Sequence, residues 1–203
     1  MKKGTKEYYN DTASKWANDW YENELMLPFL KECKSYLKDK ARVLDLGCNS
    51  GYETRRMKDL DMDVVGLDFS ENSIEIAKSK NKDIDFVCDN MLNDLTYLGK
   101  FDAVIAIASI IHIKEKDLEL CFQRIYEILN DDGYLFMVVR SEEGKLEESY
   151  KTFNDTKYDR EIYGYNRYLF DEKMNNSFKF IKEITPHDEH WKYYCYEKST
   201  NKI

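Results

Sequence analysis

The chain has 203 residues, of which 42% are hydrophobic and 14% aromatic, and its formal net charge is −8. This length and composition predict a single globular domain, residues 1–203, and exclude a disordered chain. The acidic balance argues against a nucleic-acid or anionic-membrane surface, because phosphate groups are bound by clustered Lys and Arg.

The first forty residues predict two helices. Residues 8–20 repeat aromatic and small apolar side chains at helical spacing, and Pro28 suits the first turn of a second helix. We therefore expect an N-terminal helical cap over residues 1–40, which in the simplest interpretation packs on a sheet.

The segment Ala41–Thr54 joins a buried strand to a helix through a sharp turn. Its apolar run breaks at Gly47 and Gly51, and apolar positions then recur at helical spacing. After a second strand, Asp68 lies 21 positions beyond Gly47, where a carboxylate can reach the ribose of a nucleoside in a βαβ unit. The pattern indicates a nucleoside-cofactor site.

The glycine spacing narrows the choice of cofactor. A dinucleotide site needs G-x-G-x-x-G, but Asn49 and Tyr52 occupy the second and third glycine positions. A phosphate-binding loop is absent as well, because Gly47 and Gly51 are only four apart and no Lys-Ser/Thr follows. NAD, FAD and phosphate-bearing nucleotides are therefore disfavoured.

The turn resembles motif I of the class I S-adenosylmethionine-dependent methyltransferases. That motif usually reads D-x-G-x-G-x-G and here reads Asp45, Gly47, Asn49 and Gly51. The side chain of Asn49 is the mismatch; it could crowd the methionine part of the cofactor, although Asn tolerates a left-handed backbone. The resemblance covers residues 41–140 most clearly and implies S-adenosylmethionine as the cofactor.

Further strands and helices follow along the chain. Ser70 is placed to cap a helix, and a second, strongly amphipathic helix stops at Asn130–Gly133. The near-continuous apolar character of residues 101–113 predicts a central strand, and a short helix is expected near Asp171–Asn176. The strands expected after the second are Ile84–Cys88, residues 101–113, Tyr134–Val139, Phe178–Ile184 and Trp191–Glu197.

This order of elements fits the methyltransferase sheet. We expect an α/β fold with one Rossmann-like, seven-stranded, mostly parallel sheet, helices on both faces and the last strand antiparallel. Residues 141–168 are rich in charge and tyrosine and lack a sustained apolar period. Such a stretch is more often a functional loop than a scaffold element, so it is predicted to be a lid insertion.

The resemblance also implies the cofactor-binding residues. In the family, an acid at the end of the third strand and the following backbone contact adenine, and the end of the fourth strand faces the methyl group. Capping of a turn is the alternative role for Asp89. The residues carried over onto this sequence are Asp45, Gly47, Cys48, Asn49, Gly51, Asp68, Phe69, Asp89, Asn90, Met91 and Ala106.

The acceptor site is implied by two further resemblances, an aromatic N-terminal helix and a C-terminal Arg, Arg-Tyr and Trp pattern. His112, just after the fourth strand, is the candidate general base because histidine titrates near neutrality. The alternative is a histidine that starts or caps the next helix. The substrate-binding residues expected are Tyr8, Tyr9, Trp16, Arg140, Arg167, Tyr168 and Trp191.

The leading hypothesis is an S-adenosylmethionine-dependent methyltransferase that acts on a small-molecule oxygen, nitrogen or related nucleophile. A methyl on a sulfonium is already electrophilic, so the protein need only align the nucleophile and exclude water. The alternatives are a methyltransferase acting on a protein or RNA and a non-catalytic S-adenosylmethionine-binding module. The acidic charge and the missing [DN]-P-P-[YF] signature at Ala106–Ser109 count against a nucleic-acid substrate.

Cysteine usage and apolar run lengths predict the compartment. Five cysteines form no C-x-x-C pair, which is typical of reduced core residues rather than of zinc ligands or a disulfide framework, so no metal site is expected. The amino terminus does not resemble a signal peptide, and the run Ala103–Ile111 is too short to cross a bilayer. We expect a cytoplasmic protein without a membrane span, and the choice between monomer and homodimer stays open.

Overall fold

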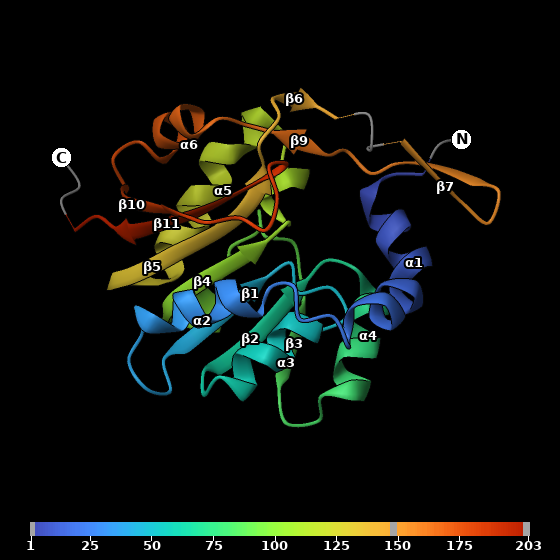
Figure 1. The fold of residues 1–203 in the computed structure, drawn as a ribbon, viewed down its shortest axis with the longest axis horizontal. Helices are drawn as coiled ribbons and strands as arrows, with labels where there is room; N and C mark the ends of the chain where they lie inside the picture. The colour runs from blue at the N-terminus through green and yellow to red at the C-terminus, as the bar shows by residue number, and fades with distance from the viewer. Residues whose placement is uncertain (1–2, 147–149, 201–203) are drawn as a thin grey trace.

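The computed structural model describes residues 3–146 and 150–200 as an α/β fold built on one seven-stranded sheet (Figure 1). The strand order is β10-β11-β5-β4-β1-β2-β3. Neighbours from β5 to β3 run parallel, and β11 is antiparallel to both β5 and β10. The predicted fold class is confirmed. The sheet strands are β1 (Arg42–Leu46), β2 (Asp63–Asp68), β3 (Asp85–Cys88), β4 (Phe101–Ile107), β5 (Leu129–Arg140), β10 (Phe178–Ile184) and β11 (Trp191–Lys198).

Helices cover both faces of the sheet because successive strand side chains point to opposite sides. Leu135 and Met137 of β5 pack in the core cluster beneath α5 and α6, whereas Phe136 and Val138 pack in the cluster beneath α2, α3 and α4. These layers are visible in Figure 1. The helices are α1 (Thr5–Trp20), α2 (Leu27–Ser35), α3 (Tyr52–Asp59), α4 (Glu71–Lys80), α5 (Glu115–Ile128) and α6 (Arg167–Met174), with short 3₁₀ turns at η1 (Thr96–Leu98) and η2 (Ile110–His112).

Several element boundaries follow from local chemistry. The predicted cap of α4 is present, since Ser70 Oγ accepts a hydrogen bond from the backbone N–H of Ser73. Helix α6 starts earlier than predicted because Asn166 caps it, accepting from the N–H of Leu169. Strand β5 also starts earlier, at Leu129, and a register shift against β4 accommodates the predicted turn residues 130–133.

Residues 141–168, predicted to be a lid insertion, contain short strands among the described residues. This stretch contains two short antiparallel pairs and also enters the first turn of α6. A short pair satisfies its backbone groups without the long apolar period on which the prediction relied. The pairs are β6 (Gly144–Lys145) with β9 (Tyr163–Gly164), and β7 (Tyr150–Phe153) with β8 (Thr156–Asp159).

Helix α1 and the β7–β8 hairpin lie side by side at one end of the molecule (Figure 1). The backbone of Lys3 donates to the carbonyl of Lys157 and accepts from the N–H of Asp159. The hydroxyl of Tyr158 donates to Asp11 at 2.7 Å, and this carboxylate also pairs with the side chain of Lys3. Within the described residues, no helix is long and apolar enough to cross a membrane.

Candidate active site

The carboxyl ends of β1 to β4 open onto a cavity of about 520 Å³. Helix α1 closes part of it, and the start of α3, the end of β5, the segment before β9 and the start of β11 also contribute to its wall. Open α/β sheets place their ligand sites at this edge, where loops can vary without disturbing the sheet. The cavity has the size of a small-molecule site.

The turn after β1 is held in a left-handed conformation. Gly47 and Gly51 have φ angles of +86° and +81°, and Asn49 has a φ of +49°. A Cβ at Gly47 would lie 2.3 Å from the Cβ of Ser109, so only glycine fits there. The side chain of Asn49 folds back onto its own turn, where its Oδ1 accepts from the N–H of Ser50 at 2.7 Å. Asparagine therefore replaces the usual glycine in a conformation that it tolerates.

Asp68 presents a buried carboxylate to the cavity from the end of β2. Its two oxygens accept from the N–H groups of Asn49 and Ser70, each at 2.9 Å. Burial raises the pKa of Asp68 to about 6, although these backbone donors oppose the shift. Each carboxylate oxygen can accept a further hydrogen bond, which suits the adjacent hydroxyls of a ribose.

The end of β3 supplies Asp89, Asn90 and Met91 to the cavity wall, and Phe69 lines it beside them. Asp89 also caps its own turn: it accepts from the Tyr97 hydroxyl and from the N–H of Asn90, both at 2.7 Å. The hydrogen bond from Tyr97 is the main cause that lowers the pKa of Asp89. Asp89 therefore caps its turn, which was the alternative role, and also lines the cavity.

Four of the expected cofactor residues, Asp45, Cys48, Gly51 and Ala106, do not line the cavity. Asp45 accepts from the Thr54 hydroxyl at 2.6 Å, which ties β1 to α3, and burial raises its pKa to about 7. At Gly51 an added Cβ would lie 2.9 Å from the ring of Phe86, so no larger residue fits there. Ala106 packs in the core cluster beneath α5 and α6, and Cys48 packs in the cluster beneath α2, α3 and α4.

Tyr9 and His112 form a hydrogen-bonded pair on the cavity wall. The Nε2 of His112 lies 2.8 Å from the Tyr9 hydroxyl, and its Nδ1 lies 3.0 and 3.1 Å from the carbonyl oxygens of Arg160 and Glu161. Carbonyls only accept, so Nδ1 carries the proton and Nε2 accepts from Tyr9. Burial lowers the pKa of His112 to about 4, so the imidazole is neutral at pH 7. The predicted helix-capping alternative does not describe this residue, because the residue at the start of α5 is Lys114.

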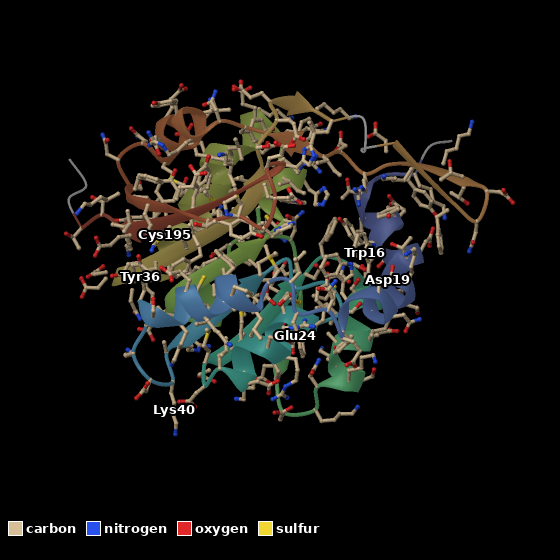
Figure 2. All side chains as sticks on the ribbon, viewed as in Figure 1. Trp16, Asp19, Glu24, Tyr36, Lys40 and Cys195 are labelled. Atoms are coloured by element: carbon tan, nitrogen blue, oxygen red, sulfur yellow. The ribbon has the colours of Figure 1, made fainter. Side chains whose placement is uncertain are left out.

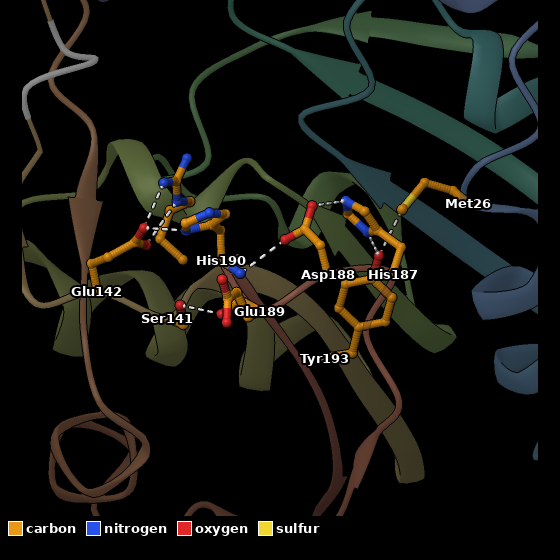
Figure 3. Close-up of polar contacts among 9 residues, drawn as sticks. Met26, Ser141, Glu142, His187, Asp188, Glu189, His190 and Tyr193 are labelled. Atoms are coloured by element: carbon orange, nitrogen blue, oxygen red, sulfur yellow. Dashed lines mark hydrogen bonds and ion pairs between the residues drawn. The ribbon is translucent and has the colours of Figure 1, made fainter.

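The end of β5 contributes Arg140, whose guanidinium lies 5.1 Å from the centre of the Trp191 ring. Arg140 Nε and Nη2 donate to the two carboxylate oxygens of Glu142, which also contacts His190 (Figure 3). This ion pair lowers the pKa of Glu142 to about 2. His187 lines the same side of the cavity and is hydrogen-bonded to Tyr193.

Three residues of the expected acceptor site do not line the cavity. Tyr168 is 74% exposed, and Arg167 packs over the rings of Tyr168 and Phe180 and pairs with Asp171. Both stand on α6, which packs against α5 on the other side of the sheet from α2 to α4. Tyr8 lies buried behind Tyr9, in edge-to-face contact with it. The four expected residues on the wall are Tyr9, Trp16, Arg140 and Trp191.

Sequence analysis missed Glu53, Arg160 and His187 on the cavity wall. A signal for Glu53 exists, because it stands four positions before Met57, on the buried stripe of α3. A charged residue on an apolar stripe is unusual enough to be informative. Arg160 and His187 lie outside regular elements, where periodicity carries no information.

A sequence profile described as "Methyltransferase domain" matches residues 43–133. A Geobacillus sp. (strain WCH70) protein, named only by its presumed methyltransferase activity, is 34% identical over 118 residues, or 55% of this chain and 47% of that protein. The malonyl-[acyl-carrier protein] O-methyltransferase of Bacillus anthracis is 25% identical over 159 residues, or 76% of this chain and 58% of the enzyme. The chain spans about half the length of the curated relatives it matches.

Solved structures share the fold at lower identity. The magnesium protoporphyrin IX methyltransferase of Synechocystis PCC 6803, crystallised with bound SAH, superposes with a TM-score of 0.72 at 15% identity. The match covers 96% of this chain and 98% of that chain. At this identity the likeness establishes the fold.

Proposed function

Because this chain belongs to the class I S-adenosylmethionine-dependent methyltransferase superfamily, we propose that it transfers a methyl group from S-adenosylmethionine to a small-molecule acceptor. The observation that carries the proposal is the Asp68 carboxylate, buried at the end of β2 and aimed into the cavity beside a turn that leaves no room for a Cβ at Gly47. This combination suits a nucleoside without a pyrophosphate.

The residues on the wall fit the cofactor in three parts. Asp68 would accept hydrogen bonds from the ribose hydroxyls, and Phe69, Asn90 and Met91 would enclose the adenine. Gly47 would allow the backbone to approach the amino-acid part of the cofactor. When bound, the cofactor supplies an electrophilic methyl on its sulfonium, and the protein's contribution is orientation and exclusion of water.

Tyr9 and His112 are proposed to position the acceptor. The neutral imidazole accepts the Tyr9 O–H, so the oxygen of Tyr9 acts only as an acceptor, toward the side chain of Arg160 and toward an acceptor hydroxyl or amine. We assign His112 the role of a positioning residue, because its Nε2 is taken up by Tyr9 and its pKa of about 4 makes it a weak base.

We expect Tyr9→Phe to lower kcat/KM for the acceptor by about tenfold, the equivalent of one lost hydrogen bond. The ring is retained, so its packing against Phe69 is kept and the dissociation constant for S-adenosylhomocysteine should change less than about threefold. Steady-state kinetics and calorimetry measure the two quantities. Tyr8→Phe is the matched control, since Tyr8 does not line the cavity. Equal kinetic effects of the two substitutions would remove Tyr9 from the acceptor site.

We further propose that residues 1–203 act as one domain in which residues 1–40 form a cap and residues 141–168 a lid. The contacts of Lys3 and Asp11 with β8 support this arrangement, because they join the two segments at the edge of the cavity. A cytoplasmic location is proposed because all five cysteines are free thiols, four of them buried, and thiols stay reduced in the cytoplasm.

Methyl transfer from radiolabelled S-adenosylmethionine into cell extracts tests the proposed function. We expect label in the low-molecular-weight fraction after addition of the purified protein. Label in protein or RNA would instead indicate a macromolecular acceptor, and binding of the cofactor without transfer to any fraction would indicate a non-catalytic module. This chain matches only 58% of the Bacillus anthracis enzyme. The acyl-carrier substrate in that enzyme's name is therefore not carried over to this chain.

A further inference from the structure

Glu53 is a buried carboxylate on the cavity wall whose oxygens make no hydrogen bond. It is the second residue of α3, and its exposed fraction is 4%. Both Oε1 and Oε2 are buried and lack a hydrogen-bond partner among the residues that the structure describes. A buried carboxylate without donors lowers stability, so its presence at a ligand cavity calls for a ligand that supplies them.

The ion pair between Arg56 and Glu53 leaves this requirement unmet. Arg56 Nη1 lies 3.6 Å from Glu53 Oε1, which is beyond hydrogen-bonding distance. The guanidinium of Arg56 instead donates to the carbonyl oxygens of Trp20, Tyr21 and Tyr52. Burial raises the pKa of Glu53 to about 7, and the Arg56 charge offsets only part of that shift. A second cation inside the cavity would favour the ionised carboxylate.

Aromatic rings line the cavity together with Glu53. The ring centres of Trp16 and Trp20 are 6.4 Å apart, those of Trp20 and Tyr52 are 6.1 Å apart, and both pairs are stacked. All three rings are on the cavity wall, and Trp16 on α1 is labelled in Figure 2. Ring faces attract cations, and a carboxylate beside them adds a charged hydrogen-bond acceptor.

We propose that Glu53, with the ring faces of Trp16, Trp20 and Tyr52, binds a protonated amine of a ligand in the cavity. This inference rests on the proposed function, because it assigns chemistry to one part of the same cavity. The amine belongs either to the amino-acid part of the cofactor or to the acceptor. Both sources present the same alkylammonium group, and binding measurements separate them.

Glu53→Gln tests the proposal, since it removes the charge and keeps the volume. Calorimetry gives the dissociation constants of S-adenosylhomocysteine, which carries an ammonium group, and of 5′-methylthioadenosine, which does not. Tryptophan fluorescence then follows n-butylammonium and the neutral n-butanol, with and without saturating S-adenosylhomocysteine. Glu75→Gln, exposed on α4, is the matched control.

A cofactor amine predicts at least a tenfold loss of affinity for S-adenosylhomocysteine in Glu53→Gln, with 5′-methylthioadenosine changed less than about twofold. An acceptor amine predicts unchanged cofactor affinity and at least a fivefold loss for n-butylammonium alone, measured with the cofactor site filled. In either case the melting temperature should stay level or rise, because a buried carboxylate without hydrogen-bond donors is replaced by a neutral amide. A glutamate that only holds Arg56 would instead lower the melting temperature on replacement.

The proposal is overturned if none of the ligands changes affinity more than about twofold in Glu53→Gln. Failure of the wild-type protein to bind either nucleoside would contradict the proposed function and not this inference, because the n-butylammonium comparison on the ligand-free protein still decides the role of Glu53.

Discussion

Replacing Gly47 by Ala is expected to destabilise the fold by about 2 to 5 kcal/mol. A left-handed backbone costs a non-glycine residue about 1 to 2 kcal/mol, and forcing a methyl group into a packed site adds about 1 to 3 kcal/mol. Gly47 has a φ of +86°, and an added Cβ would lie 2.3 Å from the Cβ of Ser109. Urea unfolding monitored by tryptophan fluorescence measures the change.

Two control variants separate the causes of this loss. Gly144 has the same φ of +86° but no atom within 4 Å of an added Cβ, so Gly144→Ala reports backbone strain alone. Ser109→Gly removes the clashing atom and should restore part of the stability of Gly47→Ala in a double-mutant cycle. An unchanged unfolding midpoint for Gly47→Ala would show that the turn can shift, and the close approach of β1 to Ser109 would not be required.

Asp68→Ala should lower the affinity for S-adenosylhomocysteine roughly ten- to a hundredfold, or about 1.5 to 3 kcal/mol. The substitution removes the buried acceptors proposed for the ribose hydroxyls. It also strands the N–H groups of Asn49 and Ser70, so stability should fall as well. Asp68→Asn keeps one oxygen acceptor and separates the loss of charge from the loss of shape. Calorimetric affinity unchanged in folded Asp68→Ala would remove this carboxylate from the cofactor site.

Because the pKa of Asp68 is raised, both stability and cofactor affinity should depend on pH through this residue. Burial raises this pKa from its ordinary value near 3.8 to about 6, so the folded state holds a proton that the unfolded state has released between these two values. Stability contributed at this residue therefore falls as pH rises through that window. Ligand affinity changes in the opposite direction, because hydroxyl donors prefer the carboxylate. We expect tighter binding of S-adenosylhomocysteine at pH 7 than at pH 5, with the part due to Asp68 lost in Asp68→Asn. Asp45 and Glu53, each with a pKa of about 7, titrate nearby and make that variant comparison necessary.

Local sequence determined the framework of the cofactor end. The glycine turn, the cap at Ser70 and the apolar strands are encoded within a few residues of each other, and backbone stereochemistry alone restricts what they form. Parallel strands then bring their carboxyl ends to one edge, so Asp68 and Asp89 were expected on neighbouring strands and lie there. The spacing of Gly47 and Asp68 indicated a nucleoside, and the resemblance of the turn to motif I implied S-adenosylmethionine.

The residues of the proposed acceptor site depend on which elements pack together, and the sequence patterns identified only some of the residues that line the cavity. Tyr9 and Trp16 reach the cavity from α1, whereas Arg167 and Tyr168 lie outside it because α6 packs on α5. Helical spacing indicates which side chains share a face but not which neighbour that face meets.

Only the tertiary structure decided the chemistry of the cavity wall. His112 is neutral because the packed chain buries it and so lowers its pKa, and two backbone carbonyls about fifty residues away in sequence fix its tautomer by accepting from Nδ1–H. Glu53 becomes a candidate amine site because it shares the cavity wall with rings from α1 and the start of α3 and no donor reaches its oxygens among the described residues. Burial and hydrogen bonding are properties of the packed chain, and they set the charge of each group at the site. The sequence by itself therefore determined the strands and the glycine turn at the proposed cofactor site, and the packing of distant segments decided which other groups lie on the cavity wall.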